Sequence, residues 1–147
     1  MGLLFSGGDI GCSSIYVWDI STWTVRSKLN YHSAAISSIT GIPNTDYIFS
    51  CSLDKTLKLY NYQTSLITSC HKSPYSYMKA VYYEQEQIVA VMTPGVNVDL
   101  FFVELGGEEY RLLERKGIVC GGRIGIMEKG GCGGSDLLVV GLYAAGI

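Results

Sequence analysis

Residues 50–61 read SCSLDKTLKLYN, and they carry the pattern that decides the fold. Apolar and polar residues alternate through TLKLYN, which is typical of a half-buried β-strand. A single carboxylate, Asp54, stands six residues before Tyr60. The pattern of the rest of the chain indicates whether this spacing has a catalytic or a structural role.

The end of this stretch recurs along the chain. LKLYN (57–61) has counterparts in IYVWD (15–19) and LFFVE (100–104), at offsets of 42 and 43 residues. A second short apolar stretch recurs at intervals of 44, 41 and 50 residues: LFSG (4–7), IFSC (48–51), VAVM (89–92) and VVGL (139–142). A repeat of this length indicates an array of similar structural units.

Two further strand candidates lie between these stretches in each unit. They are TVRSKL (24–29) and ISSIT (36–40), then SLITSC (65–70) and MKAVYY (78–83), then EYRLLERK (109–116) and GRIGIME (122–128). We therefore expect four short strands per unit. EYRLLERK is the one stretch whose apolar residues also fit helical spacing.

Four short strands per 40 to 45 residues, with Trp18-Asp19 closing the third strand, resemble the WD40 family of β-propellers. The resemblance rests on motifs in residues 1 to about 104 and on spacing alone in residues 105–147. In the second unit, Tyr31-His32 stands where the family has Gly-His, and Tyr60-Asn61 stands where it has Trp-Asp. We expect an all-β, WD40-like propeller fragment of four-stranded antiparallel blades. An antiparallel β-sandwich is the alternative, but it leaves the 42-residue period unexplained.

The repeat divides residues 1–147 into parts of a single, incomplete propeller domain. The parts are a half blade (1–19), two blades (20–61 and 62–104) and a degenerate, truncated blade (105–147). Because blades bury their faces against neighbours around a closed ring, about three blades would leave apolar flanks open. We expect such a chain to self-associate or to need another chain.

The resemblance also implies a structural role for the carboxylate. Asp54 would accept hydrogen bonds from turn amides and from His32, and His32 would meet Ser50 or Ser52. Tyr60 stands where an indole would end the network, and Trp18 is its counterpart in the first unit. The other units depart from this spacing, since Asp9 lies nine residues before Trp18 and the matching position of the third unit is Asn97.

No pattern of catalytic residues emerges. The second histidine, His71, follows Cys70 directly, and adjacent residues on a strand point to opposite faces. The glycines of GGRIGIMEKGGCGG (121–134) lack the spacing that cradles phosphates, and no metal-ligand cluster is evident. We expect a non-catalytic protein without a cofactor or a metal.

The cysteines and the termini predict an intracellular protein, cytoplasmic or nuclear. Five cysteines without a C-x-x-C pair are typical of free thiols: Cys12, Cys51, Cys70, Cys120 and Cys132. The apolar stretches are too short to cross a membrane. MGLLFS (1–6) fits the pattern for acylation of Gly2, although a hydrophobic strand is the favoured interpretation. A net charge of -2 argues against general phosphate binding.

The features that remain favour protein binding. Eleven tyrosines exceed the needs of a core of this size, and tyrosine is favoured at interfaces. The resemblance places one set of loops on the face that propellers use for partners, and the candidate contact residues there are Tyr31, Ser33, Leu53, Lys55, Lys72, Tyr75 and Tyr77. We expect a scaffold or adaptor with a protein or peptide partner. The alternative is an RNA- or ribosome-associated propeller.

Overall fold

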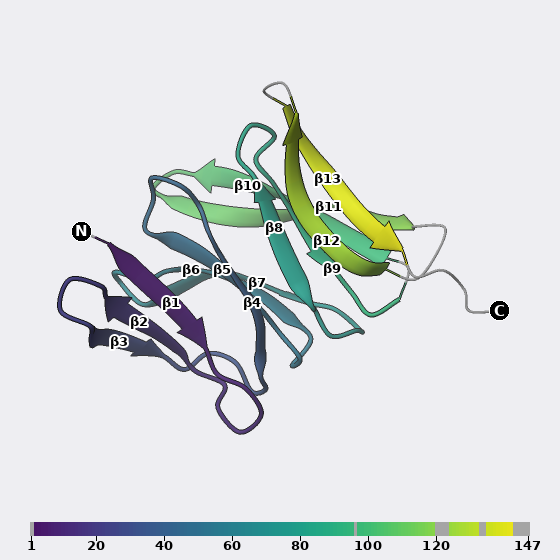
Figure 1. Cartoon of the computed structure of the whole chain (residues 1–147). Coiled ribbons are helices and arrows are strands. Elements are labelled where there is room, and N and C mark those ends of the chain that lie inside the picture. The colour runs from purple at the N-terminus through teal and green to yellow at the C-terminus, as the bar shows by residue number, and fades with distance from the viewer. Residues whose placement is uncertain (1, 96, 120–123, 133–134, 143–147) are drawn as a thin grey trace.

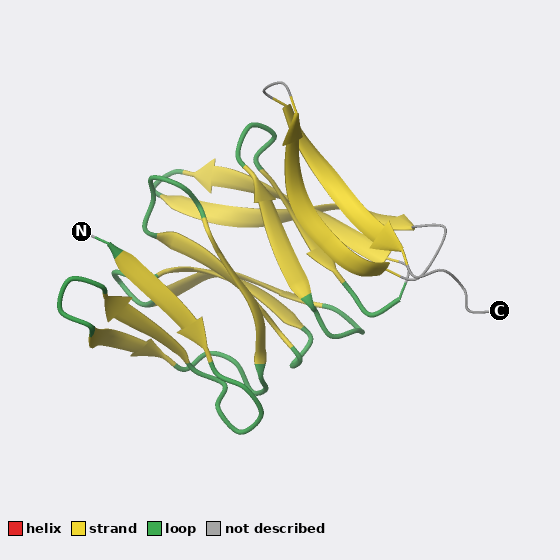
Figure 2. Ribbon diagram, in the orientation of Figure 1, coloured by secondary structure: helices red, strands yellow, loops and turns green. Residues whose placement is uncertain are grey.

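The computed structural model describes residues 2–95, 97–119, 124–132 and 135–142. Every regular element in these ranges is a β-strand (Figure 2). No helix in this part of the chain could therefore span a membrane. The expected all-β fold is confirmed.

The strands form antiparallel sheets in which each strand pairs with its neighbour in sequence. The first sheet holds β1 (Leu3–Gly7), β2 (Ile15–Asp19) and β3 (Thr24–Leu29). The second holds β4 (Ile36–Gly41), β5 (Tyr47–Ser52), β6 (Thr56–Asn61) and β7 (Leu66–Lys72). The third holds β8 (Lys79–Tyr83), β9 (Ile88–Met92), β10 (Asn97–Gly106) and β11 (Glu109–Val119). A hairpin of β12 (Ile124–Cys132) and β13 (Ser135–Leu142) follows.

The sheets follow one another in chain order (Figure 1). The first strands of successive sheets, β1, β4, β8 and β12, contact one another. Between β4 and β8, Thr40 Oγ1 donates to the Ala80 carbonyl at 3.0 Å, and the Ala80 amide donates to Ser38 Oγ at 3.2 Å. Neighbouring sheets thus meet along their inner strands, as propeller blades do, and not as two stacked layers of a β-sandwich.

The repeat units of the sequence are offset from the sheets by one strand. β3 opens the unit 20–61, but its hydrogen bonds run to β2 in the first sheet. Likewise β7 opens the unit 62–104 and pairs with β6. Each of these two sequence units therefore contributes its first strand to one sheet and its other strands to the next sheet.

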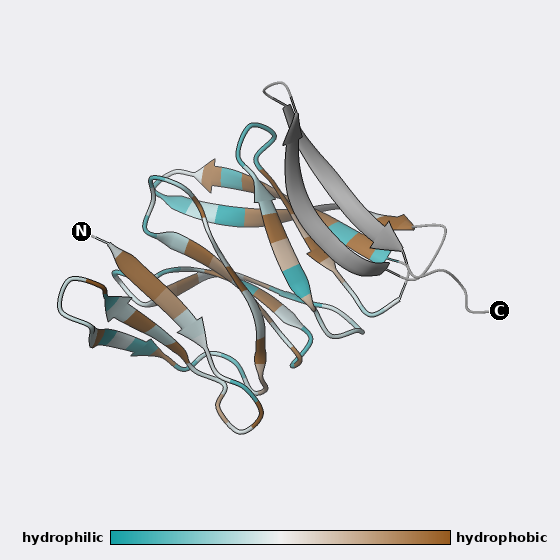
Figure 3. Ribbon diagram, viewed as in Figure 1, coloured by the Kyte–Doolittle hydropathy of each residue, from teal (hydrophilic) through white to brown (hydrophobic). Residues whose placement is uncertain are grey.

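Period-2 alternation sends the two faces of the second sheet into two different cores. Phe49 and Leu59 point toward the third sheet and pack with Val89 and Phe101. Ile48 and its cross-strand partner Tyr60 point toward the first sheet, where they meet Ile15, Val17 and Leu29. The hydropathy colouring shows the apolar bands that these strands contribute (Figure 3). The second sheet is therefore buried on both faces.

The stretch that fits helical spacing is a strand. EYRLLERK (109–116) lies within β11, which pairs with β10 from Glu109 to Val119 with one register shift. Its apolar positions Tyr110 and Leu112 pack against the core between the second and third sheets. Pairing with β10 satisfies the backbone along the whole segment, so tertiary context overrides the ambiguous local pattern.

Candidate functional site

The β5–β6 turn, residues 53–55, is fixed by backbone hydrogen bonds. Ser52 accepts from two amides of the turn: Asp54 N donates to Ser52 Oγ at 3.0 Å, and Lys55 N donates to the Ser52 carbonyl at 3.2 Å. Lys55 has a φ of 71°, a left-handed conformation that few non-glycine residues adopt. The turn is therefore held by its surroundings and not by a glycine.

Asp54 is the acceptor at the centre of this turn. Its Oδ2 receives the Ser33 amide at 3.0 Å and His32 Nδ1 at 2.8 Å. Its Oδ1 receives the amide and the hydroxyl of Thr56 at 2.9 and 2.5 Å. One carboxylate thus joins the β3–β4 loop to the start of β6.

His32 connects Asp54 to the core of the sheet. Its Nε2 lies 2.5 Å from Ser50 Oγ, whereas the Ser52 hydroxyl donates to the Ala34 carbonyl at 3.1 Å. Of the two serines that the sequence left open, Ser50 contacts the imidazole in the structure. The sequence analysis missed Thr56, whose position two residues after a turn aspartate was the available signal.

The electrostatics of the pair assign a neutral imidazole and an ionised carboxylate. Burial lowers the pKa of His32 below its ordinary value, and the hydrogen bond to Asp54 offsets this only in part. Burial also opposes the charged form of Asp54, but hydrogen bonds from Thr56, Ser33 and His32 outweigh it and lower the pKa to about 2. The Nδ1–H of His32 therefore donates to Asp54, and the Ser50 hydroxyl donates to Nε2.

Tyr60 does not complete the network as an indole would. Its side chain is fully buried, and its hydroxyl has no hydrogen bond of normal geometry among the described residues. Burial is the main cause that raises the pKa of Tyr60, and the nearby Ser50 hydroxyl counteracts it only in part. The Ser50 hydroxyl is already engaged with His32 Nε2. Tyr60 acts through packing, with its ring against Tyr31.

The indole link is present in the first sheet instead. Trp18 Nε1 donates to Ser6 Oγ at 2.9 Å. Ser6 and Trp18 occupy the register positions of Ser50 and Tyr60, two residues apart on paired strands. The two halves of the expected network therefore lie in different sheets.

Most of the candidate contact residues lie at the loop rim of the second sheet. Leu53 is 41% exposed and Tyr75 is 56% exposed. Ser33, Lys55 and Lys72 are exposed as well. These five residues, Ser33, Leu53, Lys55, Lys72 and Tyr75, are called the rim residues below.

Two of the candidate tyrosines differ from that expectation. Tyr77 has 0% exposure, and its hydroxyl donates to Asp99 Oδ2 at 3.2 Å while its ring packs edge-on against Phe101. The interpretation of Tyr77 as a surface contact is therefore wrong for this structure. Tyr31 is half-buried, and its hydroxyl donates to the Ser65 carbonyl, so it also serves packing.

Within the described residues, no group of histidine, cysteine and acidic side chains could hold a metal ion. Cys12, Cys51 and Cys70 are free thiols, and burial raises the pKa of Cys51. Cys120 lies outside the described residues, and so do Gly133, Gly134 and Met1 of the acylation motif.

The fold is that of a WD40-type β-propeller, seen here as open sheets. A chain of a crystal structure of the mitotic checkpoint complex superposes with a TM-score of 0.68 at 15% identity, covering 80% of this chain and 37% of that one. The U5 small nuclear ribonucleoprotein 40 kDa protein of Dictyostelium discoideum is 40% identical over 57 residues, which cover 36% of this chain. The chain spans only 16% of the length of that relative. No family model matches.

The first prediction concerns the carboxylate. Asp54→Ala should lower the free energy of unfolding by about 1 to 3 kcal/mol, because four donors lose their acceptor. Asp9→Ala, which removes an exposed carboxylate from the β1–β2 loop, is the control and should change it by less than about 0.5 kcal/mol. Chemical denaturation measures both. Equal stabilities of the two variants would remove Asp54 from its structural role.

The second prediction is a pH dependence. The pKa of His32 is lower in the folded state than its ordinary value of 6.5. The contribution of His32 to the free energy of unfolding is therefore complete above pH 6.5 and is lost as the pH falls below 6.5. The Asp54 contribution is lost later, as the pH falls from 3.8 toward about 2. Thermal melts between pH 7.5 and 5 should show the first decline in the parent and in His71→Asn, but a weaker one in His32→Asn. A decline that vanished in His71→Asn alone would assign the effect to the other histidine.

The third prediction compares two buried tyrosines. Tyr60→Phe should change the free energy of unfolding by less than about 0.5 kcal/mol or stabilise the fold, because it removes a buried hydroxyl without a hydrogen bond of normal geometry. Tyr77→Phe should cost about 1.5 to 3 kcal/mol, because it deletes a hydrogen bond to the Asp99 carboxylate. Denaturation midpoints in the reverse order would contradict both assignments.

Proposed function

We propose that this chain contributes to a non-catalytic protein-interaction scaffold or adaptor, and that the rim residues contact its protein or peptide partner. The observation that carries the proposal is the position of Leu53. Its apolar side chain is 41% exposed at the tip of the β5–β6 turn. An exposed leucine alone needs no explanation, but one on a rigid turn offers a preorganised contact.

The turn that presents Leu53 is held on both sides. The Leu53 amide donates to the Ala35 carbonyl at 3.0 Å, and the Leu53 carbonyl accepts from Ser76 Oγ at 3.2 Å. Asp54 and the left-handed Lys55 fix the next two positions. A partner that binds Leu53 would therefore pay little entropy for ordering the loop.

The neighbouring rim residues suit a mixed, peptide-like surface. Tyr75 offers a large amphipathic contact area at low entropic cost. Lys55 and Lys72 add positive charge beside Leu53, on a chain whose net charge is -2. An apolar anchor with a polar and aromatic border is the usual anatomy of a small binding patch.

The relatives support a role in assemblies. One matched structure is a mitotic checkpoint complex, and the curated relative is named as a small nuclear ribonucleoprotein protein. WD40-type propellers are generally non-catalytic. We include an intracellular location, cytoplasmic or nuclear, in the proposal, and self-association through open sheet edges is a further way in which the chain could assemble.

An RNA-associated role is the second candidate, since the rim carries Lys55 and Lys72 and the curated relative is named for a ribonucleoprotein. The salt dependence of binding distinguishes the two candidate functions. RNA binding through lysines should weaken steeply as the salt concentration rises, whereas contact through Leu53 should change little.

The fourth prediction tests the rim. Leu53→Asp should weaken binding of the partner captured from an extract of the source cells at least tenfold, about 1.4 kcal/mol, and change stability by less than about 1 kcal/mol. The matched control is Leu66→Asp, which changes a 57% exposed leucine at the start of β7 and should bind normally. Titration of the purified partner, with a thermal melt of each variant, gives both readouts. Parallel loss of folding and binding in Leu53→Asp, or equal losses in the two variants, would remove Leu53 as an anchor.

A further inference from the structure

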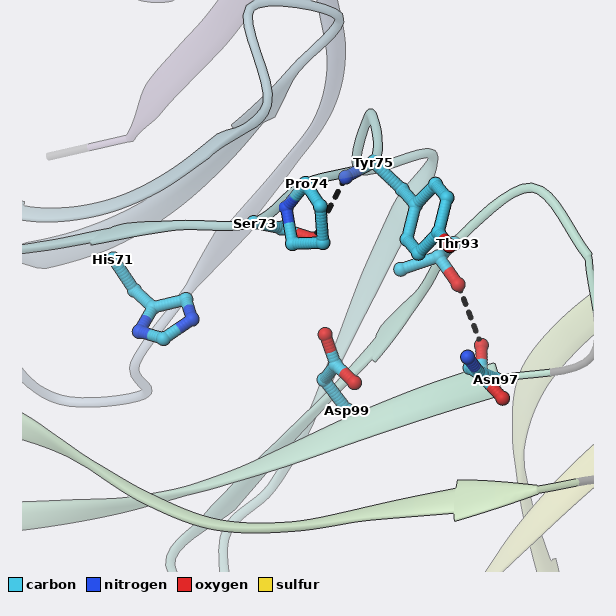
Figure 4. Close-up of a pocket in the computed structure, with 7 residues that line it drawn as sticks. All are labelled: His71, Ser73, Pro74, Tyr75, Thr93, Asn97 and Asp99. Atoms are coloured by element: carbon cyan, nitrogen blue, oxygen red, sulfur yellow. Dashed lines mark hydrogen bonds between the residues drawn. The ribbon is translucent and has the colours of Figure 1, made fainter.

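A cavity of about 200 Å³ lies between the second and third sheets at the end that carries the rim residues. Its walls come from His71 at the end of β7, from the loop residues 73–75, and from Thr93, Asn97 and Asp99 around the β9–β10 turn. Figure 4 shows the Asp99 carboxylate directed into this space, with the rings of His71 and Tyr75 at its sides.

The residues around the cavity differ from those at the same end of the second sheet. Asp99 pairs with Val91 as Lys58 pairs with Ser50, so by strand register Asp99 corresponds to Lys58 and not to a member of the hydrogen-bond network. The ring of Tyr75, which borders the cavity, is 56% exposed.

The walls are held in place without that network. The Tyr75 amide donates to Ser73 Oγ at 3.1 Å, and Thr93 Oγ1 donates to the Asn97 carbonyl at 3.0 Å. The Ser73 amide donates to the Lys55 carbonyl at 2.9 Å, which links the cavity to the Leu53 turn. The His71 ring is positioned by an edge-on contact with Phe101, at 4.7 Å between centroids.

From this geometry we infer that the cavity binds the guanidinium group of an arginine side chain. Asp99 supplies a carboxylate, which can accept several hydrogen bonds at once, including the one from Tyr77 at 3.2 Å. Thr93 and Asn97 add polar atoms to the same wall. Tyr75 and His71 supply ring surfaces, and a planar guanidinium both stacks on rings and pairs with a carboxylate through two parallel hydrogen bonds.

Other ligand charges fit the cavity less well. The carboxylate of Asp99 repels an anion such as phosphate. A lysine ammonium would meet the charge of Asp99 but would not use the flat ring surfaces or form a two-bond fork. The inference rests on the proposed function only for the source of the ligand, which would be an arginine of the bound partner.

The test uses the full 147-residue chain and small probes. In NMR titrations, acetyl-arginine amide should shift the amide signals of Tyr75, Thr93 and Asp99 in a saturable way. Acetyl-citrulline amide, which lacks the charge, and acetyl-lysine amide, which lacks the planar fork, should each bind at least fivefold more weakly. Equal binding of arginine and citrulline probes, equal binding of arginine and lysine probes, or preferential binding of inorganic phosphate would each overturn the inference. These comparisons use the parent protein and do not depend on the folding of a variant.

Variants locate the site. Asp99→Asn should weaken the arginine probe at least fivefold, whereas the matched change Asp9→Asn in the β1–β2 loop should leave it unchanged. Leu53→Asp should also leave the probe unchanged, so failure of the cavity and failure of the rim proposal give different results. Equal affinities of Asp99→Asn and Asp9→Asn for the arginine probe would overturn the assignment to this cavity.

Discussion

The Asp54 carboxylate is the constraint on which the second sheet depends. Two amides, a hydroxyl and an imidazole converge on its two oxygens, and they come from the β3–β4 loop and from the first residue of β6. The loop that leads from the first sheet to the second is thereby tied to a turn within the second sheet. Because the carboxylate stays ionised and His32 stays neutral, the contact works as a set of charge-assisted hydrogen bonds and not as a buried pair of full charges.

The three sheets carry different polar contacts. The first sheet carries the indole link between Trp18 and Ser6, and the second carries the links between His32, Ser50 and Asp54. In the third sheet Asp99 stands at the register position of Lys58, and it borders a cavity together with Tyr75 and Asn97. A repeat fold tolerates this variation because each sheet is held mainly by apolar contact with its neighbours. The carboxylate of Asp99 keeps its hydrogen bond from Tyr77 and also borders the inferred arginine site.

The sequence predicted the features that local patterns determine. Period-2 alternation located the strands, and the resemblance to the WD40 family implied the contacts of Asp54 with His32 and of His32 with Ser50 that the structure contains. Tyr77 was misjudged because its position next to a loop suggested exposure, while its burial depends on Phe101 and Asp99, more than 20 residues away. The helical spacing of residues 109–116 was ambiguous for the same reason, since only the long pairing with β10 makes them a strand. Contacts across sheets decide such cases, and no local pattern contains them.

In the proposed function, stability and recognition are separable because they would use opposite sides of one turn. The polar groups of Asp54 point inward to His32 and Thr56, and the side chain of the preceding residue, Leu53, is left at the surface. A residue that served both purposes could not change without cost to folding. Here the inward residue fixes the shape, and the outward residue is free to match a partner. The backbone hydrogen bond from the Ser73 amide to the Lys55 carbonyl connects this turn to the neighbouring cavity, so one rigid turn orients both Leu53 and one wall of the inferred arginine site.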